Sequence, residues 1–310
     1  MQPRTRRIQA LALAQVVVSG CAGTPCAAPP ASPVTIHSAA SPQQASLDPN
    51  AGSEISCSAW HREPIPGTET VLINNVWNER WAEGAPHRQC LLRRGDAPAY
   101  RYGWSWDWPS YKPYFSYAAP EALYGWKAWD GGKSTTSALP RRIDQLESLK
   151  VDFAVDLSAE KTHNLNLTMW VTASGVTTVD PNPADIRNEV MVWFSNPGRL
   201  GGGITYDGEV TLGAFSFDVW HLTNHADAAG TANTWTMVLY VSKVDVSSAS
   251  FDLKLVLDDL VGRGLVQPTH TVGGVELITE VFGGKGKLWL ERFDVTARDA
   301  PAASRGAPRP

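Results

Sequence analysis

The stretch Asn188-Glu189-Val190-Met191-Val192-Trp193-Phe194 has the strongest strand pattern in the chain. Alternate side chains of a strand point to opposite faces of its sheet. One face of this strand would carry Val190, Val192 and Phe194, a pattern that predicts burial in a core. The other face would carry Glu189 beside a methionine and a tryptophan. A carboxylate in such apolar surroundings indicates a functional group.

A second stretch of the same kind runs Glu276-Leu277-Ile278-Thr279-Glu280-Val281-Phe282. If it forms one continuous strand, Glu280 shares a face with Glu276, Ile278 and Phe282. Two carboxyl groups in apolar, aromatic surroundings are what acid/base and nucleophilic catalysis on glycosides requires. Glu189 and Glu280 are therefore the candidate catalytic residues.

Composition limits the class of protein. The chain has 310 residues, 43% of them hydrophobic, which suffices for a sizeable core in a single domain. The net charge of −4 provides no basic field, so no nucleic-acid partner is expected. The 13 tryptophans fit a Trp-rich β-sandwich core, and their flat faces also suit stacking on sugars.

The N-terminal residues resemble an export signal. Three arginines precede an apolar run over residues 8–18 that is too short to span a bilayer as a lone anchor. The run ends in Val18-Ser19-Gly20-Cys21, which resembles a bacterial lipoprotein signal with Cys21 as the lipidated residue. We expect an exported protein, secreted or lipid-anchored at the bacterial cell surface or in the periplasm, with no other contact to the membrane.

Four segments follow from this pattern. Residues 1–21 are the expected signal peptide, and residues 22–54, rich in Ala, Pro and Ser, are an expected disordered linker. Residues 55–297 are the expected folded domain, and residues 298–310 an expected disordered tail. A monomer is the default expectation.

Two cysteines remain inside the expected domain, Cys57 and Cys90. In an oxidising compartment they can pair as a disulfide, and the alternative is two free thiols. The seven histidines show no ligand spacing with cysteines or carboxylates, so neither a metal site nor another cofactor is expected. His221 and His225 are expected on a solvent-exposed loop.

Short strands divided by Gly, Pro, Asn and Asp predict a β-sandwich or jelly roll. The expected strands cover residues 70–75, 100–106, 148–156, 164–172, 188–194, 208–215, 217–223, 234–241, 272–282 and 287–296. One helix is expected around Leu253 to Val261, with Ser248 or Ser250 as its cap and a Lys254–Asp258 pair along one face.

Five motifs occur in a telling order. They are Asn74-Asn75-Val76-Trp77, the Trp-rich residues 102–109, residues 119–126, and the two strands that carry Glu189 and Glu280. With the helix before the second of these strands, the chain resembles glycoside hydrolase family 12, the β-jelly-roll endoglucanases, over about residues 57–296. The resemblance implies an all-β jelly roll of two packed antiparallel sheets, with one helix and a substrate cleft on the concave face.

The resemblance also implies roles for individual residues. Glu189 would be the nucleophile and Glu280 the general acid/base of a retaining endo-β-1,4-glucanase, with a β-glucan polysaccharide as substrate. Asn75 and Trp77 would contact sugar in the donor subsites, Met191 would line the site, and Trp126 is a candidate for the cleft wall. Glu121, Asp107 and Glu276 are expected to have structural roles.

Two positions depart from the family pattern. Thr168 stands where many members carry an aspartate beside the nucleophile, and Ile278 stands where a glycine often occurs. Ile278 could exclude water from Glu280 and so raise the pKa of that carboxyl group. Three alternatives stay open: a xyloglucan or mixed-linkage β-glucan hydrolase, a non-catalytic carbohydrate-binding β-sandwich, and a structural lipoprotein.

Overall fold

The computed structural model describes residues 52–95, 100–110, 116–127, 133–175, 185–196, 198, 200, 202–225 and 234–301. The expected signal peptide, Cys21, and most of the expected linker and tail lie outside these residues. Within them, no helix has the length and apolar character needed to cross a membrane.

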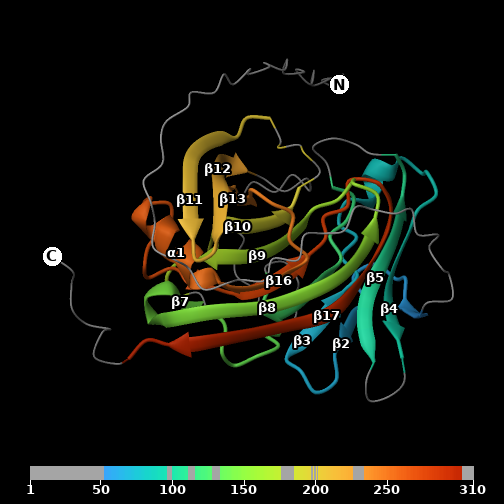
Figure 1. Cartoon of the computed structure of the whole chain (residues 1–310), viewed down its shortest axis with the longest axis horizontal. Coiled ribbons are helices and arrows are strands. Elements are labelled where there is room, and N and C mark those ends of the chain that lie inside the picture. The colour runs from blue at the N-terminus through green and yellow to red at the C-terminus, as the bar shows by residue number, and fades with distance from the viewer. Residues whose placement is uncertain are drawn as a thin grey trace, which may run out of the picture. The chain divides into compact units, whose positions relative to one another are not determined.

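Strands are the main regular structure of the described chain (Figure 1). Its single α-helix, α1, covers Leu253–Gly262, and two short 3-10 helices cover Glu79–Ala82 and Ile143–Gln145. The strands are β1 (Ser53–Ser56), β2 (Arg62–Pro64), β3 (Thr70–Ile73), β4 (Arg88–Arg94), β5 (Arg101–Trp108), β6 (Glu121–Gly125), β7 (Arg141–Arg142), β8 (Leu146–Ala159), β9 (Leu165–Thr172), β10 (Ile186–Ser195), β11 (Thr205–Leu212), β12 (Phe215–His225), β13 (Trp235–Ser242), β14 (Ser248–Asp252), β15 (Thr271–Val272), β16 (Gly274–Ile278) and β17 (Gly284–Asp299).

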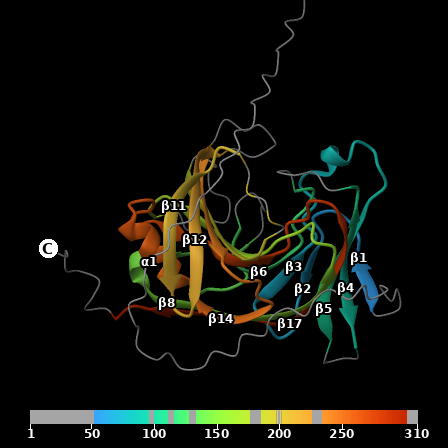
Figure 2. The same ribbon diagram turned by 45° about the horizontal axis from the view of Figure 1, so that its top comes forward.

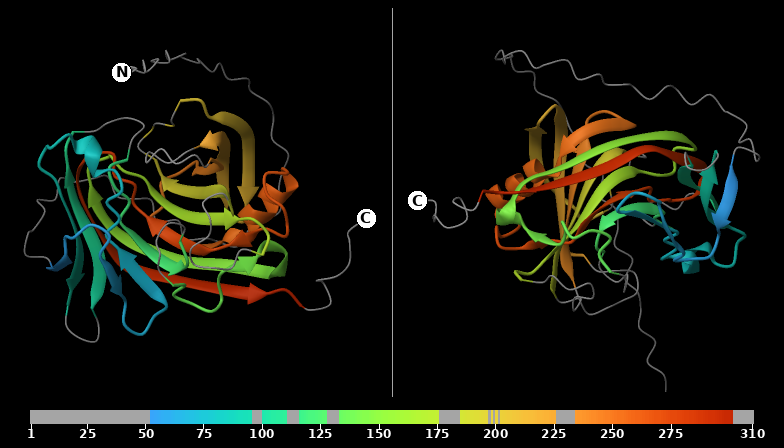
Figure 3. Two further views of the ribbon diagram at one scale, coloured as in Figure 1. Left: turned by 180° about the vertical axis from the view of Figure 1, so that it is seen from behind. Right: turned by 90° about the horizontal axis from the view of Figure 1, so that it is seen from below.

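These strands form two sheets. One has six strands in the order β1-β4-β5-β17-β8-β14, and β8 and β17 run side by side through it as its longest pair (Figures 1 and 2). The other has eleven strands, with the order β11-β12-β13-β10-β9-β16-β6-β3-β2 and with β7 and β15 attached beside β9. Helix α1 lies next to β11 at one edge (Figure 3).

Both sheets contribute to one hydrophobic core. Trp104, Phe153 and Leu288 enter it from the six-stranded sheet, while Leu167 and Val192 enter it from the eleven-stranded sheet. All five are fully buried. The opposite face of the eleven-stranded sheet, which we call the site face, is left to carry polar and aromatic side chains.

The jelly-roll prediction is confirmed, with one correction to the expected antiparallel pairing. Strands β10 and β13 are parallel, with Glu189 opposite Met237 in their register. The reason is topological, because the chain passes from β10 to the outer strand β11 and returns through β12 before β13. All other pairs in the two sheet orders are antiparallel.

Several element boundaries differ from the sequence prediction. Strand β1 begins at Ser53, inside the expected linker, and β17 continues to Asp299, inside the expected tail, where it pairs with Leu146 of β8. Strands β4, β6 and β14 were not predicted, because charged residues or short length obscure their alternation. The residues Ser248 and Ser250, expected to cap the helix, lie in β14.

The helix itself agrees with its predicted pattern. Its cap is Asp252, whose carboxylate accepts hydrogen bonds from the backbone N–H groups of Lys254 (3.0 Å) and Leu149 (2.9 Å). The predicted Lys254–Asp258 pair is present at 2.5 Å. Leu253, Leu257 and Leu260 point into the core, so the helix is fixed by burial of one face.

A disulfide joins Cys57 to Cys90 of β4, with a sequence separation of 33. Cys90 is fully buried and packs against Leu92 and Trp289 of the six-stranded sheet. The bond therefore ties the segment between β1 and β2 to the interior of the six-stranded sheet.

Reducing this disulfide is expected to lower the free energy of unfolding by about 2–4 kcal/mol, because the closed loop no longer restricts the unfolded chain. Denaturant unfolding with and without dithiothreitol measures the change. The double variant Cys57→Ala/Cys90→Ala should show no response to the reductant. An equal unfolding free energy for the oxidised and reduced wild-type chain would contradict the prediction.

Candidate active site

Glu189 lies in the middle of β10 and points to the site face. The core side of the strand carries Val190, Val192 and Phe194, all fully buried, as the sequence predicts. The pairing places Glu189 between Trp170 of β9 and Met237 of β13. Its position therefore follows from strand alternation together with the order of the strands.

Two side chains from the strands to one side of β10 lie close to the carboxylate of Glu189: Trp235 begins β13 and His225 ends β12. Trp235 Nε1 donates a hydrogen bond to Glu189 Oε2 at 3.0 Å, and His225 Nε2 lies 3.9 Å from the same oxygen. The His225 ring packs edge-on against Trp235, with a centroid distance of 5.3 Å. Both contacts favour the ionised form of Glu189.

Burial acts against these contacts. The side chain of Glu189 is only 16% exposed. Desolvation raises its pKa above the ordinary value, and His225, Trp235 and Lys127, in that order, counteract the rise. Glu189 is thus a carboxylate taken out of water whose negative charge is stabilised by specific neighbours.

Glu280 lies just beyond the end of β16, which corrects the expected continuous strand over residues 272–282. Strand β16 ends at Ile278. The Thr279 N–H donates to Pro120 O (3.1 Å), but Pro120 has no N–H to return, so the ladder is interrupted there. The backbone of Glu280 turns to Asn164 instead, whose N–H donates to Glu280 O at 3.1 Å.

A chain of hydrogen bonds orients the carboxyl group of Glu280. Asn164 Nδ2 donates to Glu280 Oε2, while Asn164 Oδ1 accepts from the backbone N–H of Glu280 (3.1 Å) and from Asn166 Nδ2 (2.8 Å). Thr168 Oγ1 donates to Asn166 Oδ1 at 2.5 Å. The side-chain oxygens of Asn164 and Asn166 both accept hydrogen bonds, so the amide NH2 group of Asn164 must face Glu280.

Burial raises the pKa of Glu280 to about 7, the hydrogen bond from Asn164 counteracts part of the rise, and the charge of Glu189 adds to it. The upward direction is the one expected from the sequence, and Ile278 is itself buried. The two carboxyl groups are therefore close enough for the charge of Glu189 to act on Glu280.

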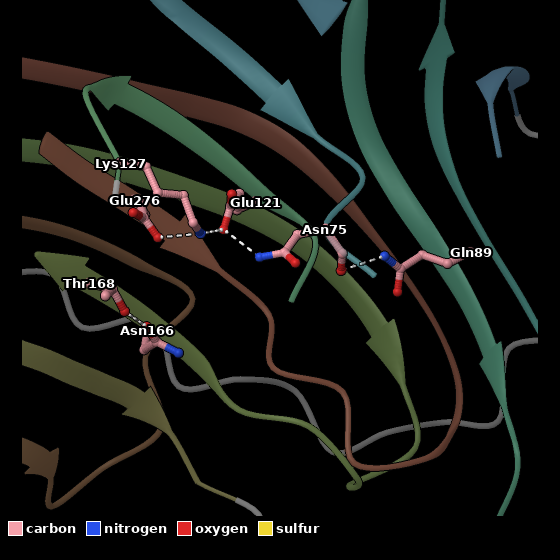
Figure 4. A network of polar contacts seen from close by, with 7 residues as sticks. All are labelled: Asn75, Gln89, Glu121, Lys127, Asn166, Thr168 and Glu276. Carbon is pink, nitrogen blue, oxygen red and sulfur yellow. Dashed lines mark hydrogen bonds and ion pairs between the residues drawn. The ribbon is translucent and has the colours of Figure 1, made fainter. Parts of the chain in front are cut away.

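A buried ion-pair network lies on the same face (Figure 4). Lys127 Nζ contacts Glu121 Oε2 at 2.6 Å and Glu276 Oε2 at 3.0 Å. We call Glu121, Lys127 and Glu276 the buried triad. Glu276 faces Thr168 in the β16–β9 register, and Thr168 faces Met191 in the β9–β10 register, so β9 separates Glu276 from the strand that carries Glu189.

The residues expected to contact substrate differ in accessibility. Trp77 is 39% exposed and can offer its ring to a ligand. Asn75 is buried, donates to Glu121 Oε2 (3.4 Å) and accepts on its backbone oxygen from Gln89 Nε2 (3.2 Å; Figure 4). Met191 is buried on the site face, in a cluster with Trp193 and Leu239.

Trp126 does not form an open cleft wall in this structure. Its ring is 2% exposed and packs with Trp170, Ile186 and Trp235. The packing depends on Gly273, because a Cβ at that position would lie 2.1 Å from Trp126 Cε3. Trp126 therefore packs against Trp170 and Trp235, the two tryptophans that lie next to Glu189.

Four polar residues of the site escaped sequence analysis: Asn164, Lys127, Trp235 and His225. The expectation of a solvated loop for His225 and His221 is wrong. His225 ends β12 beside Glu189, and His221 lies within β12, where its Nδ1 contacts Asp207 Oδ2 at 2.5 Å. A usable signal existed only for Asn164, which alternates with Asn166 and Thr168 on one strand face.

Metal ligands are not assembled at these carboxylates. Among the described residues, the one group of His, Cys, Asp and Glu side chains close enough to share an ion is Glu54 with Cys57 and Cys90. Both sulfur atoms of this group are in the disulfide. The chemistry that the site face offers is that of two carboxyl groups whose pKa values are both raised by burial, one beside an indole N–H and a histidine and the other beside a neutral amide.

Comparisons with known proteins agree with this geometry. The sequence model of Glycosyl hydrolase family 12 matches residues 68–297. The structure is similar to the native family 12 xyloglucanase from Bacillus licheniformis, at 24% identity and a TM-score of 0.65, over 78% of this chain and 99% of that chain. No curated protein matches in a sequence search.

Two further solved structures share the fold. Endoglucanase cel12A from Rhodothermus marinus is 24% identical with a TM-score of 0.62, over 79% of this chain and 99% of that one. Endoglucanase 3 from Trichoderma harzianum is 16% identical with a TM-score of 0.61, over 80% and 99%. At these identities the likeness shows the fold, whereas the family model covers well over half of the 310 residues. The chain therefore belongs to glycosyl hydrolase family 12 and is a glycoside hydrolase.

Proposed function

We propose that the protein is a retaining endo-β-1,4-glucanase in which Glu189 is the nucleophile and Glu280 the general acid/base. The observation that carries the proposal is the pairing of these two carboxyl groups on one sheet face in unequal surroundings. Retention requires carboxyl groups about 5–5.5 Å apart. The effect of the Glu189 charge on the pKa of Glu280 supports a close approach.

In the proposed first step, protonated Glu280 donates its proton to the oxygen of the scissile glycosidic bond. Ionised Glu189 attacks the anomeric carbon as that bond breaks, forming a glycosyl-enzyme. In the second step Glu280, now a carboxylate, takes a proton from water. The water oxygen bonds to the anomeric carbon and displaces Glu189, which releases the sugar with its configuration retained.

The neighbours of each group suit these roles. Trp235 and His225 stabilise the anion that must attack, and burial of Glu280 favours its protonated form in the resting enzyme. The first and second steps place opposite demands on Glu280. The amide NH2 group of Asn164 can stabilise the carboxylate that is needed for the second step.

Three polysaccharides are candidate substrates of this site. One similar structure is named a xyloglucanase and another an endoglucanase. Cellulose-type glucan is the primary proposal, with xyloglucan and mixed-linkage β-glucan as the alternatives on the same site. A non-catalytic sugar-binding protein is disfavoured, because it has no need for two electrostatically coupled carboxyl groups.

We also propose that the enzyme works outside the cytoplasm. The Cys57–Cys90 disulfide supports this location, because such bonds persist in oxidising compartments. Radiolabelled palmitate incorporation into wild-type and Cys21→Ala chains in a bacterial host distinguishes a lipid-anchored protein from a secreted one.

Replacement of either glutamate is expected to remove activity without unfolding the domain. Glu189→Ala removes the nucleophile and should reduce turnover to background, and Glu280→Gln should lower kcat by about 10²–10⁴-fold. Reducing-end release from carboxymethylcellulose, xyloglucan and barley β-glucan measures both effects and ranks the substrates. Proton NMR of the first product formed reports whether the anomeric configuration is retained.

The matched control is Glu291→Gln on β17, where the carboxylate pairs with Arg101 at 2.6 Å on the six-stranded sheet. This variant should keep wild-type turnover. Near-full activity in Glu189→Ala, or inversion of configuration in the first product, would contradict the mechanism. Binding of all three polymers without hydrolysis by the wild-type chain would favour the carbohydrate-binding alternative.

The pH dependence of kcat/KM should fall on its alkaline side as Glu280 loses its proton, around pH 7. Asn164→Leu removes the donor that favours the ionised form, so the pKa of Glu280 rises and the alkaline limb moves to higher pH. Thr168→Val, at the far end of the hydrogen-bond chain, should give a smaller shift in the same direction. An alkaline limb that stays in place in a folded Asn164→Leu enzyme would rule out this control of Glu280.

A further inference from the structure

The buried triad is the largest charged feature of the described site face that the proposed mechanism does not use. The exposed fractions of its side chains are 9% for Lys127, 0% for Glu121 and 1% for Glu276. Burying three ionisable groups is costly, and a well-packed apolar cluster of similar volume is often as stable. The arrangement therefore calls for an explanation beyond stability.

The fold brings the three groups together from separate places. Glu121 begins β6 and faces Ile278 of β16, while Glu276 lies within β16 itself. Lys127 follows the end of β6, two residues after Gly125, at a point where Trp126 packs over Gly273. The Trp126 N–H also donates to Gly273 O (3.1 Å), and the ammonium group of the next residue, Lys127, contacts both carboxylates.

The ammonium group of Lys127 stays protonated at neutral pH. Burial alone would lower the pKa of Lys127, but the carboxylates of Glu121 and Glu276 outweigh burial and raise it. Glu276 has the opposite tendency, because burial raises its pKa to about 8 despite Lys127. Its Oε1 atom is buried without a hydrogen-bond partner among the described residues, which also disfavours a full charge there.

The triad is one of several charged influences on Glu189. From β12 and β13 the nucleophile candidate faces His225 and Trp235, and from the end of β16 it faces Glu280. Glu276 on β16 and Lys127 also act on it electrostatically, whereas β9 presents Trp170 and Thr168, which carry no charge. Among these groups, Lys127 is the permanent cation, since His225 is charged only when protonated.

We propose that Lys127 is a positioning residue for the nucleophile: held between Glu121 and Glu276, it supplies a fixed positive charge that stabilises ionised Glu189. Glu121 and Glu276 have the role of fixing the ammonium group in place and keeping it protonated. Glu121 also binds Asn75, so the same network connects the nucleophile with a residue expected to contact sugar. The proposal rests on the function proposed above, in which Glu189 must be ionised to attack.

Two variants of the full chain test the role of Lys127. Lys127→Met removes the charge while keeping the length of the side chain. Glu121→Gln/Lys127→Met removes the charge together with its closest carboxylate, so that the second variant leaves no new unpaired carboxylate at that contact. Lys254→Met is the matched control, because Lys254 pairs with Asp258 on helix α1, away from the site face.

Two readouts are needed. The first is the acidic limb of the kcat/KM profile on carboxymethylcellulose, where activity is lost as Glu189 becomes protonated. The second is a carbon-13 NMR titration of glutamate side-chain carboxyl groups, in which the Glu189→Gln spectrum identifies the Glu189 signal. The titration does not require turnover. A wild-type chain without activity would therefore overturn the proposed function while the titration still tests the role of Lys127.

Removal of the cation is expected to make protonation of Glu189 easier. The titration midpoint of Glu189 and the acidic limb should both move to higher pH by about one pH unit in Lys127→Met, by less in Glu121→Gln/Lys127→Met because a negative charge is removed as well, and stay in place in Lys254→Met. A purely structural triad would change thermal stability but not these midpoints. Unchanged midpoints in a folded variant would overturn the proposal, and so would a failure of both variants to fold.

Discussion

The removal of carboxyl groups from water on one face of the eleven-stranded sheet is the constraint on which the rest of the site depends. Glu189, Glu276 and Glu280 all have pKa values raised first of all by burial. A buried carboxylate needs compensating donors or cations. The polar neighbours on this face can be understood as the compensation, and their differences give each glutamate a different protonation behaviour.

The compensation has a different chemical character at each glutamate. Glu189 receives an indole N–H and lies near a histidine, Glu276 receives an ammonium group, and Glu280 receives only the neutral amide of Asn164. An amide stabilises a carboxylate less than a cation does. Support alone does not set the order of the pKa values, because Glu276 has a pKa of about 8 in spite of its ammonium partner and Glu280 has a pKa of about 7. Of the two groups proposed to be catalytic, Glu280 has the weaker support, which suits the proton-donor role proposed for it.

The fold supplies this arrangement through two different layers of the same strands. The core-facing residues of β9 and β10 pack against the six-stranded sheet, and the residues that alternate with them along each strand point to the site face. Mutations on the two faces should therefore separate into effects on stability and effects on chemistry. Trp126 is an intermediate case, since it is buried on the site face and supports both Trp235 and the path of the chain to Lys127.

The sequence by itself determined the jelly roll and the helix pattern and singled out the two glutamates as candidates, because strand and helix periodicities are local properties of the chain. It also led to the expectation of a raised pKa for Glu280, which the structure matches in direction. It could not place Lys127, which follows β6, Trp235, which begins β13, or His225, which ends β12, because these residues come near Glu189 only through strand order and register. Nor could it show that the strand carrying Glu280 ends at Ile278, since Pro120 and Asn164, distant in sequence, decide that break. Register and strand order are set by packing between distant segments, and that is why only the tertiary structure could decide the electrostatics of the site.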